Sequence, residues 1–217
     1  MVERNLAKVE VASSRLVFRS NNFMNTTIIH SKPLIKLIDN FYSSQECDNI
    51  LQFDWQWKRS GGWNHELGAT KVTDERTSST VFVKLSDRSI PKEIKNLNYK
   101  LSNFLDIDIL RLEEPQLTKY NPNEKYVPHW DYFSSGKQAI NNRVATAIIY
   151  LNDNFLGGNT TFTLLNKSIM PKSGRLLYFE YDYTTEINSL TKHSGDIIFS
   201  GTKQIATVWI RKNNYKS

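Results

Sequence analysis

The 217-residue sequence has a single cysteine, Cys47, no long apolar run and no secretory leader pattern. One cysteine excludes an internal disulfide and any cysteine cluster around a metal. No stretch reaches the roughly 18 consecutive apolar residues of a membrane-spanning helix, and charges interrupt the apolar residues at the start of the chain. We therefore expect a cytoplasmic protein with no membrane partner.

The sequence also lacks any cluster of basic residues. Its formal net charge is +6, but lysine and arginine are scattered and never form a run of five or six. Nucleic-acid-binding proteins concentrate positive charge in a stripe or a patch. This pattern predicts no nucleic-acid partner, and nothing in the sequence indicates an oligomeric state.

The composition suits one folded domain. Hydrophobic residues make up 39% of the chain, and there are 5 tryptophans, 10 tyrosines and 11 phenylalanines. That is enough apolar material for a core and excludes wholesale disorder. We interpret residues 1–32 as an N-terminal extension with one or two strands (15–19 and 26–30) and residues 33–213 as a single domain.

Two helices are predicted before a strand-rich remainder. Ser43 and Glu46 form a capping-box pattern for a helix over 44–53, and Pro91 suits the first turn of a second helix that ends at Leu105. A stretch rich in Gly, Ser, Thr and charge, 58–80, predicts a long mobile loop. Short β-rich runs follow, at 115–120, 125–132, 143–151, 159–164, 174–181, 196–200 and 204–211. The pattern indicates an α+β protein, mainly β, of the sandwich or barrel type.

One short motif carries the first chemical signal. His129 and Asp131 are two positions apart in a predicted strand, so their side chains share a face. An imidazole nitrogen and a carboxylate oxygen on one face can bind the same ion. Two histidines and one carboxylate form the facial set of non-haem Fe(II) oxygenases.

A third ligand and a cation lie among the late strands. His193 is the only histidine after Asp131, and Lys203 begins the strand that contains Ile205, Thr207 and Trp209 on the same face. A lysine beside a metal site favours an anionic partner. Fe(II), one carboxylate, one lysine and a dicarboxylic 2-oxo acid together carry no net charge, which suits a buried site.

These residues, with others around them, resemble the prolyl 4-hydroxylase family of Fe(II)- and 2-oxoglutarate-dependent dioxygenases. The resemblance extends from about Pro33 to Arg211. Its blocks are residues 33–41, 44–47, 76–78, 120–133, 143–152, 157–160, 193–195, 201–203 and 209–211.

The resemblance implies a double-stranded β-helix, or jelly roll, with two or more N-terminal helices packed on one sheet. It implies catalytic metal ligands, a set that binds 2-oxoglutarate and a set near the substrate. The metal set is His129, Asp131 and His193. The co-substrate set is Lys203, Tyr120, Thr146 and Tyr150, and the substrate set is Tyr126, Arg143, Trp209 and Arg76.

The implied activity is hydroxylation of prolyl residues at C4 in a peptide or protein, with release of succinate and carbon dioxide. The cofactors would be Fe(II), 2-oxoglutarate, dioxygen and ascorbate. Two alternatives remain open: the same chemistry on another residue, a free amino acid or a small metabolite, and a non-catalytic jelly-roll module that binds a peptide.

Three features depart from the family pattern. Asn159 replaces the usual glutamate after two glycines, Asn123 replaces a glycine before the metal motif, and residues 181–192 lack the usual glycines. None of them alters the metal set, so they bear on the choice of substrate rather than on the chemistry.

Overall fold

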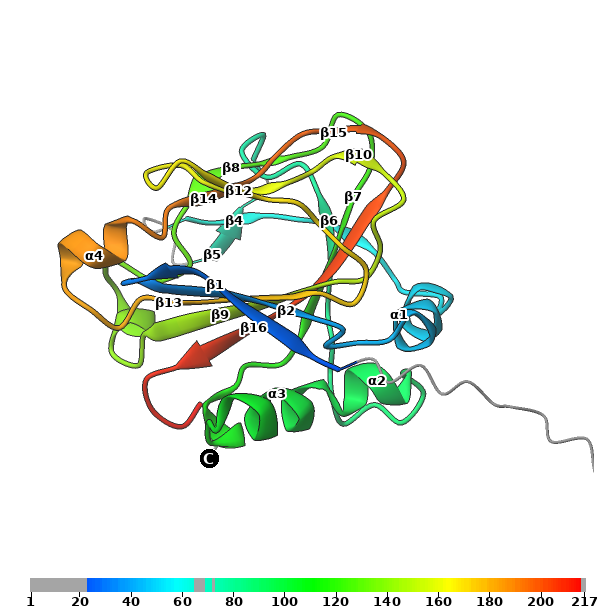
Figure 1. Cartoon of the computed structure of the whole chain (residues 1–217), viewed down its shortest axis with the longest axis horizontal. Helices are drawn as coiled ribbons and strands as arrows, with labels where there is room; N and C mark the ends of the chain where they lie inside the picture. Colours follow the sequence, from blue (N-terminus) through cyan, green and yellow to red (C-terminus); the bar gives the residue numbers. More distant parts are fainter. Residues whose placement is uncertain (1–22, 65–68, 72, 216–217) are drawn as a thin grey trace, which may run out of the picture.

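The protein, described here by a computed structural model, is built around one large antiparallel sheet (Figure 1). The structure describes residues 23–64, 69–71 and 73–215, so the predicted strand at 15–19 lies outside the described residues. In spatial order the large sheet consists of β1 (Asn25–Ser31), β2 (Leu34–Asp39), β13 (Leu176–Glu180), β9 (Arg143–Tyr150), β16 (Lys203–Arg211), β7 (Gln116–Tyr120), β6 (Ser79–Phe82) and β3 (Lys58–Arg59).

A four-stranded sheet lies over part of the large one, with two small strand pairs at its margins (Figure 1). Its order is β12 (Lys167–Ile169), β11 (Thr160–Phe162), β14 (His193–Gly195) and β8 (Tyr126–His129). The pairs are β10 (Leu156–Gly157) with β15 (Ile198–Ser200), and β4 (Gly62–Asn64) with β5 (Ala69–Lys71). Two facing antiparallel sheets confirm the predicted jelly roll.

The central strands of the large sheet divide their side chains between two cores. On β9, Ala147 and Ile149 belong to a hydrophobic cluster shared with the helices, whereas Ile148 and Tyr150 belong to a second cluster between the sheets. The two-residue period of a strand places Thr146 on the same face as the second pair. The polar residues of the site therefore project into the space between the two sheets.

Helices α1 (Ser44–Leu51), α2 (Lys92–Lys95) and α3 (Leu97–Leu105) pack on the outer face of the large sheet (Figure 1). The capping box of α1 is confirmed: the Ser43 hydroxyl accepts from the Glu46 amide at 3.2 Å, and Glu46 accepts from the Ser43 amide at 2.8 Å. Cys47, on the inner side of this helix, is buried.

Several predicted boundaries were wrong. The helix expected over 91–105 is broken at Asn96, whose backbone leaves helical geometry at φ −94° and ψ 2°, in keeping with the weak helix propensity of asparagine. The stretch 58–80 is not a simple loop, because it contains β3, β4, β5 and the start of β6. Helix α4 (Thr185–Ser189) was missed because five residues are too few to show a helical period.

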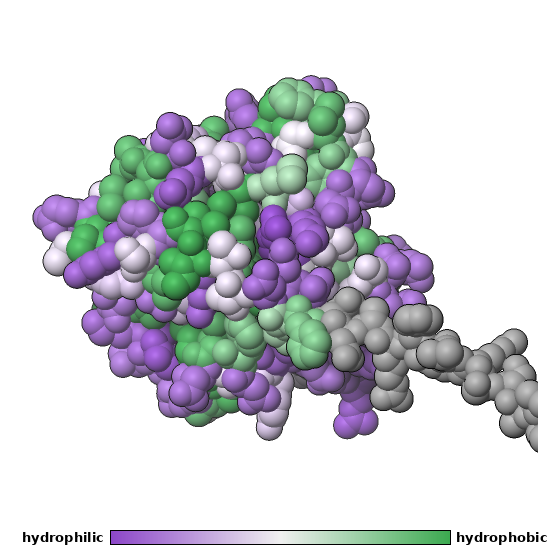
Figure 2. All heavy atoms as spheres, viewed as in Figure 1, coloured by the Kyte–Doolittle hydropathy of each residue, from purple (hydrophilic) through white to green (hydrophobic). Residues whose placement is uncertain are grey.

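The outer surface is chemically mixed. Figure 2 shows hydrophilic side chains interspersed with hydrophobic groups on the face that carries β1. Phe23, Met24 and Ile28, in or just before this strand, are exposed. Among the described residues, no helix combines the length and the apolar character needed to cross a membrane.

Candidate metal centre

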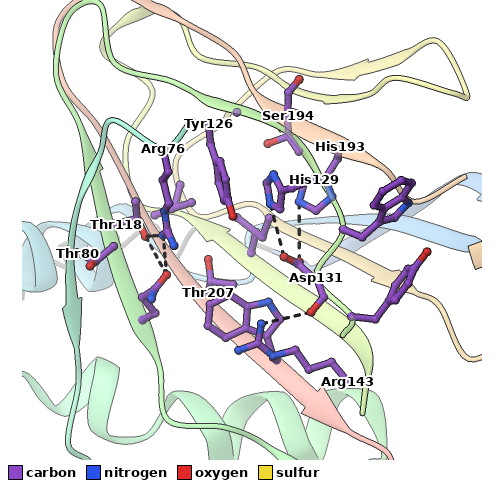
Figure 3. A pocket seen from close by; sticks show the side chains of 18 of the residues that line it. Arg76, Thr80, Thr118, Tyr126, His129, Asp131, Arg143, His193, Ser194 and Thr207 are labelled. Atoms are coloured by element: carbon purple, nitrogen blue, oxygen red, sulfur yellow. Dashed lines mark hydrogen bonds and ion pairs between the residues drawn. The ribbon is translucent and has the colours of Figure 1, made fainter. Parts of the chain in front are cut away.

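Two strands from distant parts of the sequence bring the predicted metal ligands together. In the small sheet β14 pairs with β8, and the register places His193 directly opposite His129. Strand β8 ends at His129, so Asp131 lies just beyond it rather than inside the predicted strand over 125–132. His129, Asp131 and His193 each present a ligand atom, and these atoms lie within 4.8 Å of one another (Figure 3).

The backbone fixes which nitrogen of each histidine can bind a metal. Nδ1 of His129 lies 2.9 Å from the Val127 carbonyl oxygen, and Nδ1 of His193 lies 3.0 Å from that of Thr191. A carbonyl can only accept a hydrogen bond, so each Nδ1 carries the proton. The lone pair of each ring is then on Nε2, the atom that faces Asp131. Such outer hydrogen bonds are typical of metal-binding histidines.

The carboxylate of Asp131 lies between the two rings. Oδ1 is 3.6 Å from Nε2 of His129, and Oδ2 is 3.8 Å from Nε2 of His193. Burial alone would raise the pKa of Asp131, but the two histidines and Arg143 outweigh burial and hold it well below its usual range. Burial and the neighbouring His129 lower the pKa of His193 to about 4, so its ring is neutral at neutral pH. A carboxylate and a neutral imidazole are the forms that bind a metal ion.

The three side chains fit a divalent transition metal. Two imidazole nitrogens and one carboxylate oxygen converge on one point, and this donor set suits Fe(II) with coordination positions left open. The site lies in a cavity of about 700 Å³ between the sheets, large enough to admit other reactants. Other predicted site residues line the same cavity, namely Lys203, Tyr120, Tyr126, Arg143, Trp209 and Arg76.

Lys203 is a buried residue of the cavity lining. The residue is 2% exposed, and its Nζ donates to the carbonyl oxygen of Gly158 at 2.5 Å. The ammonium lies 5.4 Å from the ring centre of Tyr120 and 5.5 Å from that of Tyr150. Burial lowers the pKa of Lys203 to about 7, and the carboxylate of Asp196 offsets only part of that change. A buried lysine of this kind favours an anionic ligand.

The other predicted co-substrate residues lie at different depths. Tyr120 is the direct cross-strand neighbour of Lys203 in the pairing of β7 with β16. Tyr150 is fully buried, and its hydroxyl donates to Oγ1 of Thr160 at 2.8 Å. The hydroxyl of Thr146 donates to Oδ2 of Asp131 at 2.7 Å. A direct role of these three residues in binding 2-oxoglutarate stays a prediction.

Arg143 belongs to a stacked, charged wall of the cavity. Its guanidinium forms two hydrogen bonds with the carboxylate of Glu113, at 2.8 and 2.9 Å, and lies 3.8 Å from the ring centre of Trp209. Arg143 also donates to the backbone oxygen of Asp131 at 3.3 Å (Figure 3). The indole Nε1 of Trp209 is buried and has no hydrogen-bond partner among the described residues. A ligand in the cavity could supply the hydrogen-bond acceptor that this buried N–H group needs.

Tyr126 and Arg76 form the opposite wall. The Tyr126 ring stacks on that of His129 with 3.5 Å between the centres, and the Arg76 guanidinium lies 4.9 Å from the Tyr126 ring centre. Arg76 also donates to the side chains of Gln116 at 2.7 Å and Thr118 at 3.3 Å (Figure 3). The backbone of 75–77 pairs with β8, so this segment is attached to the strand of the first metal ligand.

Some residues of the site were missed from the sequence. Glu113 binds the half-buried Arg143 and also lies 2.5 Å from Nε of the buried Arg211, so it joins two arginines. Tyr181 places its hydroxyl 2.9 Å from Oγ1 of Thr146. The only sequence signal near these residues was Arg211, which ends the block 209–211 that resembles the prolyl 4-hydroxylase family. Nothing in the sequence links Tyr181 or Glu113 to the metal motif.

A family comparison matches the part of the chain that contains this site. Residues 115–211 match the family model described as "2OG-Fe(II) oxygenase superfamily". That range contains all three candidate metal ligands and Lys203.

Individual relatives extend the match to most of the chain. A probable prolyl 4-hydroxylase of Arabidopsis thaliana is 28% identical over 222 residues, which cover 91% of this chain and 75% of that protein. A viral collagen prolyl hydroxylase from Paramecium Bursaria Chlorella virus-1, solved as a 2-oxoglutarate complex, is 25% identical with a TM-score of 0.61 and covers 82% of this chain and 95% of its own. A prolyl hydroxylase from Trichoplax adhaerens, solved with a peptide of hypoxia inducible factor, has a TM-score of 0.64 at 18% identity and covers 83% of this chain and 84% of its own. The last likeness supports the fold alone.

Proposed function

We propose that the chain, whose residues 115–211 match the 2OG-Fe(II) oxygenase superfamily model, acts as a prolyl 4-hydroxylase on a proline-containing peptide or protein. It is an oxygenase that uses Fe(II) and 2-oxoglutarate. The reaction consumes 2-oxoglutarate and dioxygen and yields succinate, carbon dioxide and hydroxyproline. We assign this activity to residues 33–213 as one catalytic domain.

We assign the metal to His129, Asp131 and His193. When bound there, Fe(II) supplies the activation of dioxygen, a reaction that protein side chains cannot perform alone. The contribution of the chain is to present two Nε2 atoms and one carboxylate in a fixed arrangement. The bonds from the two Nδ1 atoms to backbone carbonyls keep the rings from turning.

The observation that carries the proposal is the buried Lys203 in the same cavity as the metal set. Its Nζ has the carbonyl of Gly158 as a neutral partner, and Tyr120 is its neighbour across the strands. The distal carboxylate of 2-oxoglutarate would supply the negative charge that the ammonium favours. The other end of the molecule would then point from Lys203 toward His129 and His193.

We assign the substrate to the space between the two walls of the cavity, formed by Arg143 and Trp209 on one side and by Tyr126 and Arg76 on the other. The Trp209 indole N–H can donate to a backbone carbonyl of the substrate, since it has no partner among the described residues. Aromatic surfaces suit a proline ring, which is apolar and presents polarised C–H groups to them. The relatives named as prolyl hydroxylases support this choice over another substrate class.

The proposal is tested by the release of succinate from 2-oxoglutarate with Fe(II) and ascorbate. The assay compares a set of proline-rich peptides with the same peptides in which alanine replaces proline. We expect the proline peptides alone to raise succinate release above the uncoupled level. Mass spectrometry should find one added oxygen, and amino-acid analysis against standards should identify 4-hydroxyproline rather than 3-hydroxyproline. We include ascorbate on the expectation that it keeps the iron reduced.

One control and one possible result separate the parts of the proposal. The His129→Ala protein should release no succinate with any peptide, and its mass spectra should show no added oxygen. Succinate release that ignores the peptides in the unsubstituted protein would leave the dioxygenase in place and overturn the prolyl assignment.

A further inference from the structure

A chain of two buried hydroxyl groups ends on the carboxylate of the candidate metal centre. Oγ1 of Thr146 donates to Oδ2 of Asp131 at 2.7 Å, and the hydroxyl of Tyr181 lies 2.9 Å from the same Oγ1. Thr146 is fully buried, and Tyr181 is 2% exposed. Neither residue binds the histidines directly, so any effect on the metal must pass through Asp131.

The direction of the chain follows from the number of protons. A threonine hydroxyl has one hydrogen, and a carboxylate can only accept. Because Thr146 gives its hydrogen to Asp131, the hydroxyl of Tyr181 must be the donor to Thr146. The bonds therefore run from Tyr181 to Thr146 to Oδ2 of Asp131. Each bond polarises the next, and the last one ends on a charge.

We propose that Thr146 and Tyr181 are positioning residues that hold Asp131 in its metal-binding orientation and so set the affinity of the site for a divalent metal ion. The hydroxyl of Thr146 binds Oδ2 of Asp131. The other carboxylate oxygen, Oδ1, receives no hydrogen bond from Thr146 and lies beside Nε2 of His129. The inference rests on the proposed metal site. It adds Tyr181, and it gives Thr146 a role other than contact with 2-oxoglutarate.

A purely structural role of Tyr181 predicts a different result. Its ring packs between Tyr132 and Phe179, with ring centres 5.7 and 6.0 Å away. Tyr181→Phe keeps this ring and removes only the hydroxyl. A packing role therefore predicts no change in metal affinity, whereas the hydrogen-bond chain predicts a loss.

The test measures the dissociation constant of Mn(II), which is stable in air, from the electron spin resonance of the free ion during titration of the full chain. Thr146→Val removes the bond to Asp131 at nearly constant shape and should weaken Mn(II) binding about 10–100-fold, the usual effect of losing an outer partner of a ligand. Tyr181→Phe should weaken it less, by about 3–10-fold, because Thr146 can still donate. Thr146→Ser keeps the hydroxyl and should restore most of the affinity.

The double variant tests whether Tyr181 acts through Thr146. If it does, Tyr181→Phe should have almost no further effect in the Thr146→Val protein. Tyr42→Phe is the matched control. Tyr42 is also 2% exposed, and its hydroxyl donates to the backbone carbonyl of Glu93. It belongs to the hydrophobic cluster on the helix side of the large sheet, away from the candidate metal centre. This control should bind Mn(II) like the unsubstituted protein, and thermal unfolding should show that every variant folds.

The failure of this inference is distinguishable from the failure of the metal site. If the unsubstituted protein binds Mn(II) and folded Tyr181→Phe and Thr146→Val proteins bind it equally well, the positioning role is wrong and the metal site stands. Additive effects of the two substitutions would also overturn the chain of bonds. If the unsubstituted protein does not bind Mn(II) at all, the proposed metal site fails, and this inference fails with it.

Discussion

The protonation of Lys203 depends strongly on whether an anion lies beside it. In the protein without ligand, burial lowers the pKa of this ammonium to about 7. At pH 8 most molecules then hold a neutral lysine, which is the less costly form for a buried amine. A carboxylate placed beside Nζ would favour the charged form, so binding and protonation are linked.

We predict that 2-oxoglutarate binding takes up a proton at Lys203. Below about pH 7 the ammonium is already charged, and this group gives no pH dependence. Above pH 7 each molecule must gain a proton to bind, so the affinity should fall with rising pH, at a slope that approaches one decade per pH unit. Calorimetry of the Mn(II)-loaded protein at pH 8 in two buffers of different ionisation enthalpy measures the proton uptake.

The Lys203→Met variant is the control for this prediction. It should bind 2-oxoglutarate about 10-fold or more weakly, since it loses a buried ion pair, and it should take up no proton. An equal uptake in the variant would place the proton on another group and contradict the link to Lys203.

At the level of secondary structure, the central strands combine a structural role with a chemical one. Alternate residues of β9 and β16 face the helices or the second sheet, so one run of residues supplies both the core and the cavity. The turns between strands then fix where each strand begins. Gly174, just before β13, donates to the Tyr150 carbonyl and accepts from the Tyr42 amide.

Sequence periodicity predicted the long elements and missed the short ones. The two-residue period of β16 and the capping box of α1 were visible because each depends on neighbouring residues. Strand β14 has three residues, too few for any period, and it was found only as a histidine near the late strands. Its pairing with β8 is a contact between distant segments, which local patterns cannot encode. Glu113 and Tyr181 escaped for the same reason.

We predict that Gly174→Ala destabilises the fold more than Gly136→Ala does. Both glycines have positive φ, +75° and +83°, a backbone conformation that costs an alanine about 1–3 kcal/mol. An added Cβ at Gly136 meets nothing within 4 Å, whereas at Gly174 it would overlap the backbone oxygen of Tyr42. The overlap should add about 1–3 kcal/mol, because backbone must move. Free energies of unfolding from urea titrations measure both, and equal losses would contradict the crowding argument.

Across the whole molecule, the candidate site joins the two sheets. His129 and His193 are on strands of the small sheet, whereas Thr146 and Lys203 are on β9 and β16 of the large one. These residues are close together only in the folded chain. A metal ion and 2-oxoglutarate should therefore bind the folded state and not the unfolded one, and so connect site occupancy to global stability.

We predict that Mn(II) stabilises the folded protein and that 2-oxoglutarate stabilises it further once the metal is bound. A ligand present at 100 times its dissociation constant adds about 2.7 kcal/mol, which corresponds to a rise in Tm of about 5–10 °C for a chain of this size. Mn(II) alone should give a first rise, and 2-oxoglutarate should add a second one only when the metal is present. Both rises in Tm should be absent from the His129→Ala protein. The His30→Ala protein is the control and should keep both rises. The imidazole of His30 also bonds a backbone carbonyl, but His30 lies outside the candidate metal set. Differential scanning fluorimetry measures all three proteins. If 2-oxoglutarate raised the Tm of the His129→Ala protein as much as that of the unsubstituted one, the two ligands would bind independently, and their assignment to one shared site would be wrong.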